Sequence, residues 1–186
     1  MKHSLQTFAI VLLAMVLLSG CIPSLNPITE KNETVLPELE GLWEMEQNRY
    51  QVELNGDFYA ISVRTKDGKK DFYKMTLITI EGEHYASLTF DRDAPELQKI
   101  LSSTSDSFSL PVWRLYRLRV MDRELRLYWM NDRSDASLRD LPLFQKKGST
   151  DSILNAAPDQ LKAWLAKNKS AYAEGKNNFF TFQRSK

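Results

Sequence analysis

Residues 114–129, RLYRLRVMDRELRLYW, decide the fold, because apolar and polar side chains alternate on both sides of Asp122-Arg123. Alternation with a period of two is typical of strands that bury one face, and two such runs separated by two turn residues predict a hairpin. Pairing across that turn gathers the large apolar side chains on one face, as Val120–Leu125, Leu118–Leu127 and Tyr116–Trp129. The opposite face then pairs Arg117 with Tyr128 and Arg119 with Arg126.

The same alternation extends outward from this hairpin and predicts further antiparallel strands between turn residues. We expect strands near 41–47, 49–55, 58–65, 70–80, 84–90, 112–121, 124–130 and 178–184. A turn at Asn55-Gly56 or at Gly56-Asp57 joins the second strand to the third. Both choices keep the same side chains on each face, because they differ by an even number of residues.

The turn at 66–69 sets the next register. A glycine bulge there keeps apolar side chains opposite one another, in the pairs Val63–Tyr73, Ile61–Met75 and Tyr59–Leu77. Past Leu77 the apolar positions change parity to Ile78 and Ile80. We expect a bend at this point that helps the sheet to curl.

One helix is expected before the last strand. It begins at Pro158, a favoured first helical residue, and carries Leu161, Trp164 and Leu165 as an apolar stripe. About eight antiparallel strands joined mostly by hairpins, with one helix near the C-terminus, predict a mainly β fold. Such a meander closes, fully or nearly so, into a small barrel.

Gly41-Leu42-Trp43, at the start of the first strand, resembles the Gly-x-Trp motif of lipocalins. The resemblance implies a small lipocalin-like barrel whose floor is plugged by Trp43. It also implies that the helix lies before the last strand, as it often does in that family.

The N-terminus has the layout of a secretory signal peptide. A basic start at Lys2 is followed by an apolar run over residues 8–18 and by the small residues Ser19 and Gly20. The apolar run is shorter than the ~20 residues that a membrane-spanning helix needs. We therefore expect residues 1–20 to be a signal peptide that is removed.

Leu18-Ser19-Gly20-Cys21 resembles the lipobox of bacterial lipoproteins at every position. The resemblance implies cleavage between Gly20 and Cys21, a diacylglycerol on the Cys21 sulfur and an acyl chain such as palmitate on the new amino group. Because Ile22 rather than aspartate follows the cysteine, the family rule implies the bacterial outer membrane; another bacterial membrane is the alternative. An ordinary secreted protein with a stray cysteine is the competing interpretation of the motif.

The remainder of the chain is expected to contain a lipidated, flexible tether over residues 21–40 and a single domain over residues 41–186. The meander, the helix and the Phe-rich last strand of that domain resemble small bacterial lipoproteins of unassigned function. Removing residues 1–20 takes away one charged side chain, Lys2, and leaves 24 basic and 24 acidic residues. This balance argues against a nucleic-acid binder.

The chain is poor in residues for catalysis. Cys21 is the only cysteine, and after cleavage His84 is the only histidine, so thiol–imidazole pairs and multi-histidine zinc sites are excluded. Asp91-Arg92-Asp93 is a cluster of acids that is better explained by a turn and a helix cap. We expect no enzymatic activity, no metal and no cofactor.

The arginines of the opening hairpin interleave with aromatic residues, and they are the candidate contacts to a ligand or partner. The candidates are Arg117, Arg119, Arg126, Tyr116 and Trp129. Arg119 and Arg126 lie opposite each other and require an anion nearby. A ligand or a partner could supply that anion. In the alternative that we favour, the protein itself supplies it, from Glu124, Asp122 or an acid of the adjacent strand.

Two functions compete. The first is a structural or partner-binding role in the envelope, which predicts a packed interior. It is favoured because the side chains predicted to lie inside have the ordinary composition of a core. The second is a carrier of a small apolar or anionic ligand inside a barrel lined by Tyr50, Tyr59, Tyr116, Leu118, Leu127 and Trp129. A cavity above ~300 Å³ would favour the carrier, whereas a filled interior would exclude it. The sequence leaves the oligomeric state open.

Overall fold

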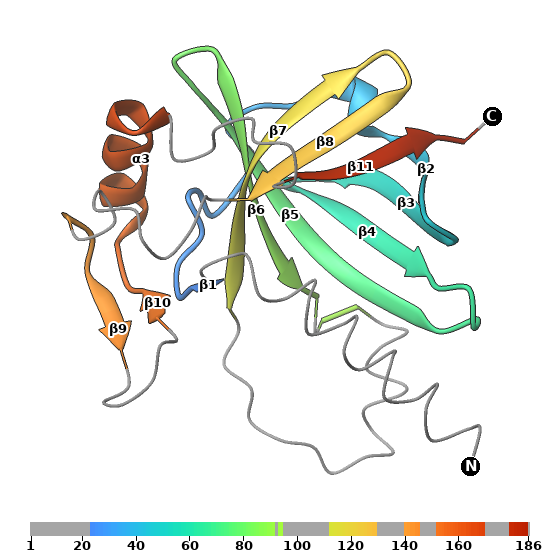
Figure 1. Ribbon diagram of the computed structural model, residues 1–186, viewed down its shortest axis with the longest axis horizontal. Helices are drawn as coiled ribbons and strands as arrows, with labels where there is room; N and C mark the ends of the chain where they lie inside the picture. The colour runs from blue at the N-terminus through green and yellow to red at the C-terminus, as the bar shows by residue number, and fades with distance from the viewer. Residues whose placement is uncertain are drawn as a thin grey trace, which may run out of the picture.

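A computed structural model describes residues 23–91, 93–94, 112–129, 140–145, 152–169 and 179–185. Eight antiparallel strands form a closed barrel in which successive strands pair and the first, β2, also pairs with the last, β11 (Figure 1). The barrel strands are β2 (Gly41–Met45), β3 (Asn48–Asn55), β4 (Phe58–Arg64), β5 (Lys70–Ile80), β6 (Glu83–Phe90), β7 (Trp113–Met121), β8 (Glu124–Trp129) and β11 (Phe179–Arg184). The expected mainly β, lipocalin-like barrel is confirmed, with the helix α3 (Pro158–Lys167) near the C-terminus.

The β7–β8 hairpin has the expected register, with Leu118 opposite Leu127 and Arg119 opposite Arg126. Between β3 and β4 the turn falls at Gly56-Asp57, the second of the two expected choices. The expected β4–β5 register is wrong by two residues, because Ile61 lies opposite Tyr73. The turn is centred one residue earlier than expected, and it is closed by a hydrogen bond from the Thr65 N–H to the Lys69 carbonyl. An even shift leaves every side chain on its expected face.

Residues 23–36, here called the N-terminal strap, lie against the outside of the barrel. The strap begins as β1 (Pro23–Ser24), which is antiparallel to the start of β7 and parallel to β10 (Ser152–Leu154). β10 in turn pairs with β9 (Leu143–Gln145). The strap leads into a short 3₁₀ helix, η1 (Pro37–Leu39), at one end of the barrel.

The docked strap differs from the flexible tether expected over residues 21–40. Its physical basis is burial: Ile28 and Leu39 are fully buried and Leu36 nearly so. Each such side chain contributes about 1.5–3 kcal/mol on leaving water, which offsets the loss of chain entropy. The prolines and polar residues around these apolar positions are typical of an extended, solvated segment, which is why a flexible tether was expected.

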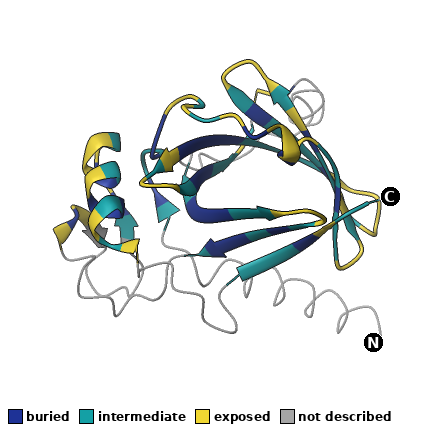
Figure 2. Cartoon of the chain, turned by 90° about the horizontal axis from the view of Figure 1, so that it is seen from above, coloured by how far each residue is buried: buried dark blue, intermediate teal, exposed yellow. Residues whose placement is uncertain are grey.

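Two separate apolar clusters stabilise the molecule. The interior core lies inside the barrel and consists of side chains such as Trp43, Leu77 and Leu118. The outer core lies between the barrel wall, the strap and α3, which stands beside the barrel (Figure 2). Helix α3 supplies the three expected residues of its stripe to this core, and all of them are buried: Leu161, Trp164 and Leu165.

The outer core also explains the change of parity in β5. Ile78 belongs to the outer core, with Ile80 packed against it, whereas Leu77 belongs to the interior core. The β5–β6 register continues without interruption as far as the pair Ile80–Glu83. The change of parity therefore involves no break in strand pairing: β5 carries apolar side chains on both faces because both faces are covered.

Candidate functional site

The barrel encloses a cavity of about 280 Å³. Its walls are mainly apolar, with Tyr50, Val52, Ile61, Val63, Met75, Leu88, Tyr116, Leu125, Leu127, Phe180 and Phe182 among them. The volume is just below the ~300 Å³ at which drug-sized pockets begin. It is nonetheless about twice that of an engineered apolar cavity that binds benzene, so a small organic molecule fits.

One end of the cavity is closed by a floor. The Trp43 indole N–H donates to the Leu39 carbonyl (2.8 Å), and both residues are fully buried. The Tyr59 hydroxyl accepts from the Leu36 N–H (2.8 Å) and donates to the Leu36 carbonyl (3.1 Å). The Arg184 guanidinium covers the Trp43 ring at 5.2 Å. These contacts seal the end of the barrel to which η1 belongs.

The opposite end is a mouth with polar side chains at its edge. Asn48, Thr65, Asp71 and Arg114 line the cavity there, at the ends of β3, β4, β5 and β7 that lie away from the floor. Asp71 and Arg114 carry opposite charges. The cavity is therefore apolar in its depth and polar at its edge, which is an arrangement suited to an amphipathic ligand.

The tyrosines near the mouth are held in their neutral form. Burial raises the pKa of Tyr73 to about 12, with Asp71 and Tyr50 adding to the rise and Arg114 opposing it. Burial also raises the pKa of Tyr50. Both side chains therefore present neutral hydroxyls at physiological pH, and the Tyr50 ring packs edge-on against Phe182 with centroids 5.0 Å apart.

The structure divides the five predicted contact residues between the two faces of the barrel wall. Tyr116 and Trp129 point into the interior core, and Tyr116 lines the cavity. Arg117, Arg119 and Arg126 belong to the opposite face, by the alternation along β7 and β8. The five residues do not form one site.

The arginines have anions within the protein, as in the alternative that we favoured. Glu83 of β6 lies 3.9 Å from Arg117 and 3.8 Å from Arg119, and Glu124 forms an ion pair with Arg126. The buried Arg117 guanidinium also stacks over Tyr128 at 4.7 Å. The wall itself thus supplies carboxylates for the opposed pair Arg119–Arg126.

The remaining polar candidates lie away from the cavity wall. His84 Nδ1 is 2.8 Å from the Thr79 hydroxyl, and neither residue lines the cavity. The Asp93 N–H donates to the Asp91 carboxylate (3.1 Å), which is a turn contact, and Arg92 lies outside the described residues. In the described part of the chain no three His, Cys, Asp or Glu side chains are placed to hold a metal ion.

A second hollow, of about 510 Å³, lies at the wall formed by β3, β4 and β5. Its lining is mixed in charge and includes Arg49, Glu53, Arg64, Lys70 and Asp91. It is more polar than the barrel interior and more than large enough for a partner's side chains.

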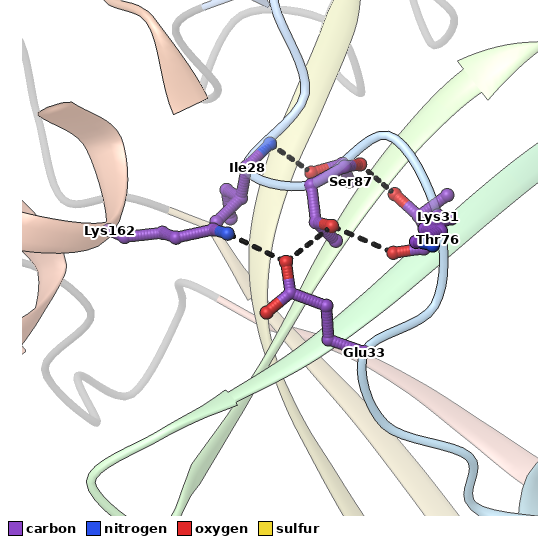
Figure 3. Close-up of polar contacts among 7 residues, drawn as sticks. Ile28, Lys31, Glu33, Thr76, Ser87 and Lys162 are labelled. Carbon is purple, nitrogen blue, oxygen red and sulfur yellow. Dashed lines mark hydrogen bonds and ion pairs between the residues drawn. The ribbon is translucent and has the colours of Figure 1, made fainter. Parts of the chain in front are cut away.

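The strap is held by buried polar contacts that the sequence analysis did not identify (Figure 3). The Ile28 N–H donates to Ser87 Oγ (2.8 Å), and the Thr76 hydroxyl donates to the Thr29 carbonyl (2.8 Å). Lys162 of α3 reaches Glu33 at 2.6 Å. Thr76 and Ser87 are polar residues in the middle of strands, with apolar neighbours. This placement is the sequence feature that could have identified them as buried hydrogen-bonding residues. At the mouth, Asp71 was not among the predicted contact residues, and Arg114 was noted only as one of the arginines of the β7–β8 hairpin.

The predicted modification site, Gly20 and Cys21, lies outside the described residues. Among the residues that are described, no helix has both the length and the apolar character needed to cross a bilayer. Comparison with family models, with curated proteins and with solved structures found no match.

Proposed function

We propose that this protein is an acylated lipoprotein of the bacterial envelope whose barrel binds a small, largely apolar molecule. The observation that carries the proposal is the cavity: it is sealed at the Trp43 floor, apolar in its depth and polar at its mouth. Such a gradient orients a ligand with its apolar part inside and its polar end near Arg114 and Asp71. No chemical step is part of this proposal, and the protein acts as a carrier rather than an enzyme.

The anchor in this proposal is Cys21, carrying a diacylglycerol and an amide-linked acyl chain. Two or three chains hold a protein firmly at a membrane, because each buried methylene contributes about 0.8 kcal/mol. The residue after Cys21 is Ile22 rather than aspartate, and this supports the outer membrane as the location. Intact mass spectrometry of the protein from its own membrane measures the acyl chains and any ligand that stays bound.

The binding function is tested with the neutral apolar probe N-phenyl-1-naphthylamine and the soluble domain, residues 23–186. We expect saturable binding at one site per barrel. Val63→Trp places a large side chain in the cavity and should weaken binding at least tenfold. Thr181→Trp, on the outward face of β11 opposite Arg126, is the matched control and should bind as the parent does. Equal binding by both variants would contradict the proposal.

A structural or partner-binding role is the second candidate, and the outer hollow at β3–β5 favours it. Arg49, Arg64 and Lys70 there offer cationic contacts to an acidic surface of another envelope protein. Photocrosslinkers placed in cells at Ser62, which lines this hollow, should capture one defined neighbour, whereas crosslinkers at the exposed Asp122, which does not line it, should not. A diffuse pattern from both positions would remove this candidate.

A further inference from the structure

We infer that the mouth of the barrel faces the membrane surface, with the floor directed away from it. The inference rests on the proposed lipidation of Cys21 and adds to it an orientation. It follows from where the strap begins, how firmly the strap is held and how little chain separates it from the anchor.

The strap begins at the mouth end of the barrel. Pro23 and Ser24 pair with Arg114 and Trp113, the first residues of β7. Arg114 lines the cavity at its mouth, whereas the floor lies at the other end, where η1 joins β2. From Ser24 the strap runs along the outside of the barrel toward the floor (Figure 1).

The strap is held along its whole length, so its starting point cannot swing away from the mouth. Ser24 is fully buried, and the Leu25 N–H donates to the Leu154 carbonyl (2.8 Å). Ile28 is fully buried, and its N–H donates to Ser87 Oγ. Near the floor, the Asn32 side chain accepts from the Leu77 N–H (2.9 Å). Releasing the strap would therefore expose buried apolar and polar groups together.

Cys21 lies only two residues before Pro23. Two residues of fully extended chain span at most about 7 Å. An acylated sulfur at that position keeps the first residue of β1, and with it the edge of the mouth, next to the headgroups. A long flexible tether would leave the barrel free to tumble, but none separates the strap from the anchor.

Exposed apolar side chains occur at both ends and do not set the orientation by themselves. Phe90 is exposed at the mouth, and Leu143 is exposed in the row of paired residues that runs through Leu154 to Ser24. Val35 and Met121 are exposed at the floor end to a similar extent. The attachment point therefore decides which pair lies at the membrane.

The test uses thiols introduced at the two ends, because acylation leaves no native thiol. Lys69→Cys marks the mouth, and Asn55→Cys and Asp122→Cys mark the floor; all three positions are exposed. Eight residues of β3, tilted as in small barrels, separate the ends by roughly 20 Å. Each acylated protein is labelled with bimane and inserted into phosphatidylethanolamine–phosphatidylglycerol vesicles that contain a headgroup-nitroxide lipid. We expect quenching at residue 69 to be at least twice that at residues 55 and 122.

A second variant tests whether the strap is the cause. Fifteen Gly/Ser residues inserted between Ile22 and Pro23 leave every strap contact intact but add a flexible reach of about 20 Å. Quenching at residue 69 should then fall to the floor value. Unchanged quenching in this variant, or equal or reversed quenching in the parent, would overturn the inference.

The same samples separate this inference from the proposed function. An intact mass without acyl chains on Cys21 would refute the anchor and the orientation together. Acylated protein without an orientation refutes only the inference. Binding of N-phenyl-1-naphthylamine by the labelled proteins reports on the cavity independently of both.

Discussion

The interior core and the outer core of this protein are both apolar, but they are assembled differently. The interior core comes mostly from alternate residues of strands joined by short turns, so each contact is close in sequence to the next. The outer core joins Ile28 of the strap to Leu154 and to Leu161 of α3, which are more than 120 residues away. Contacts of the first kind follow from local pattern, whereas those of the second depend on the completed fold.

The comparison leads to an expectation about cooperativity. Loss of an interior side chain should lower the stability of the whole barrel, because every strand contributes to that core. Loss of an outer side chain should release the strap and α3 while the barrel strands stay paired, because local opening follows contiguous units. Four variants, from the largest expected effect to the smallest, test this division.

Trp43→Ala should have the largest effect. The side chain is fully buried on the floor, donates to Leu39 and is covered by Arg184. Removing a buried tryptophan costs about 3–5 kcal/mol. Urea unfolding followed by far-UV circular dichroism should show this loss in one transition of the whole barrel. A loss below about 1.5 kcal/mol would mean that the floor is dispensable.

Leu161→Ala should cost about 2–4 kcal/mol, because the residue is buried at the centre of the outer core. Hydrogen exchange should speed up in the strap and α3 but not in β3 and β4. Lys167→Ala, at an exposed position near the end of α3, is the control and should leave exchange unchanged. Equal acceleration in β3 would show that the two cores unfold as one.

Ser87→Ala should cost about 1–3 kcal/mol, since it leaves the buried Ile28 N–H without its acceptor. The effect should be confined to the strap and appear as faster exchange at residues 24–34. Ser62→Ala, on β4 and at the outer hollow rather than under the strap, is the matched control. If both variants behave alike, the contact does not hold the strap.

Glu33→Gln should have the smallest effect, below about 1 kcal/mol, because the ion pair with Lys162 is partly exposed. The Lys162 contact lowers the pKa of Glu33 below its usual value of 4.5. A lowered pKa in the folded state means that the contribution is present above about pH 4.5 and is lost as the pH falls below it. The difference in unfolding free energy between parent and variant should therefore shrink between pH 5 and pH 3.

The eight strands, α3 and the interior position of Leu118 and Leu127 follow from the sequence, because period-two alternation and turn residues are local signals. The register of the β4–β5 hairpin does not follow from the sequence, since alternation fixes which face a side chain occupies but not which residue lies opposite it. The parity change at Ile78 was visible, yet its cause lay in the strap, which is remote in the chain. The cavity was recognisable only as a set of interior residues, because packing decides whether such a set leaves space.

The pairing of β2 with β11 has a consequence for biogenesis. The first barrel strand, β2, pairs with β3 early, but it finds its second partner only when Gln183 and Arg184 of β11 have been made. No N-terminal fragment can complete the cylinder, and a growing chain carries an unpaired strand edge until then. We expect the polypeptide to need protection from aggregation until β11 is available, and the barrel to close only after that.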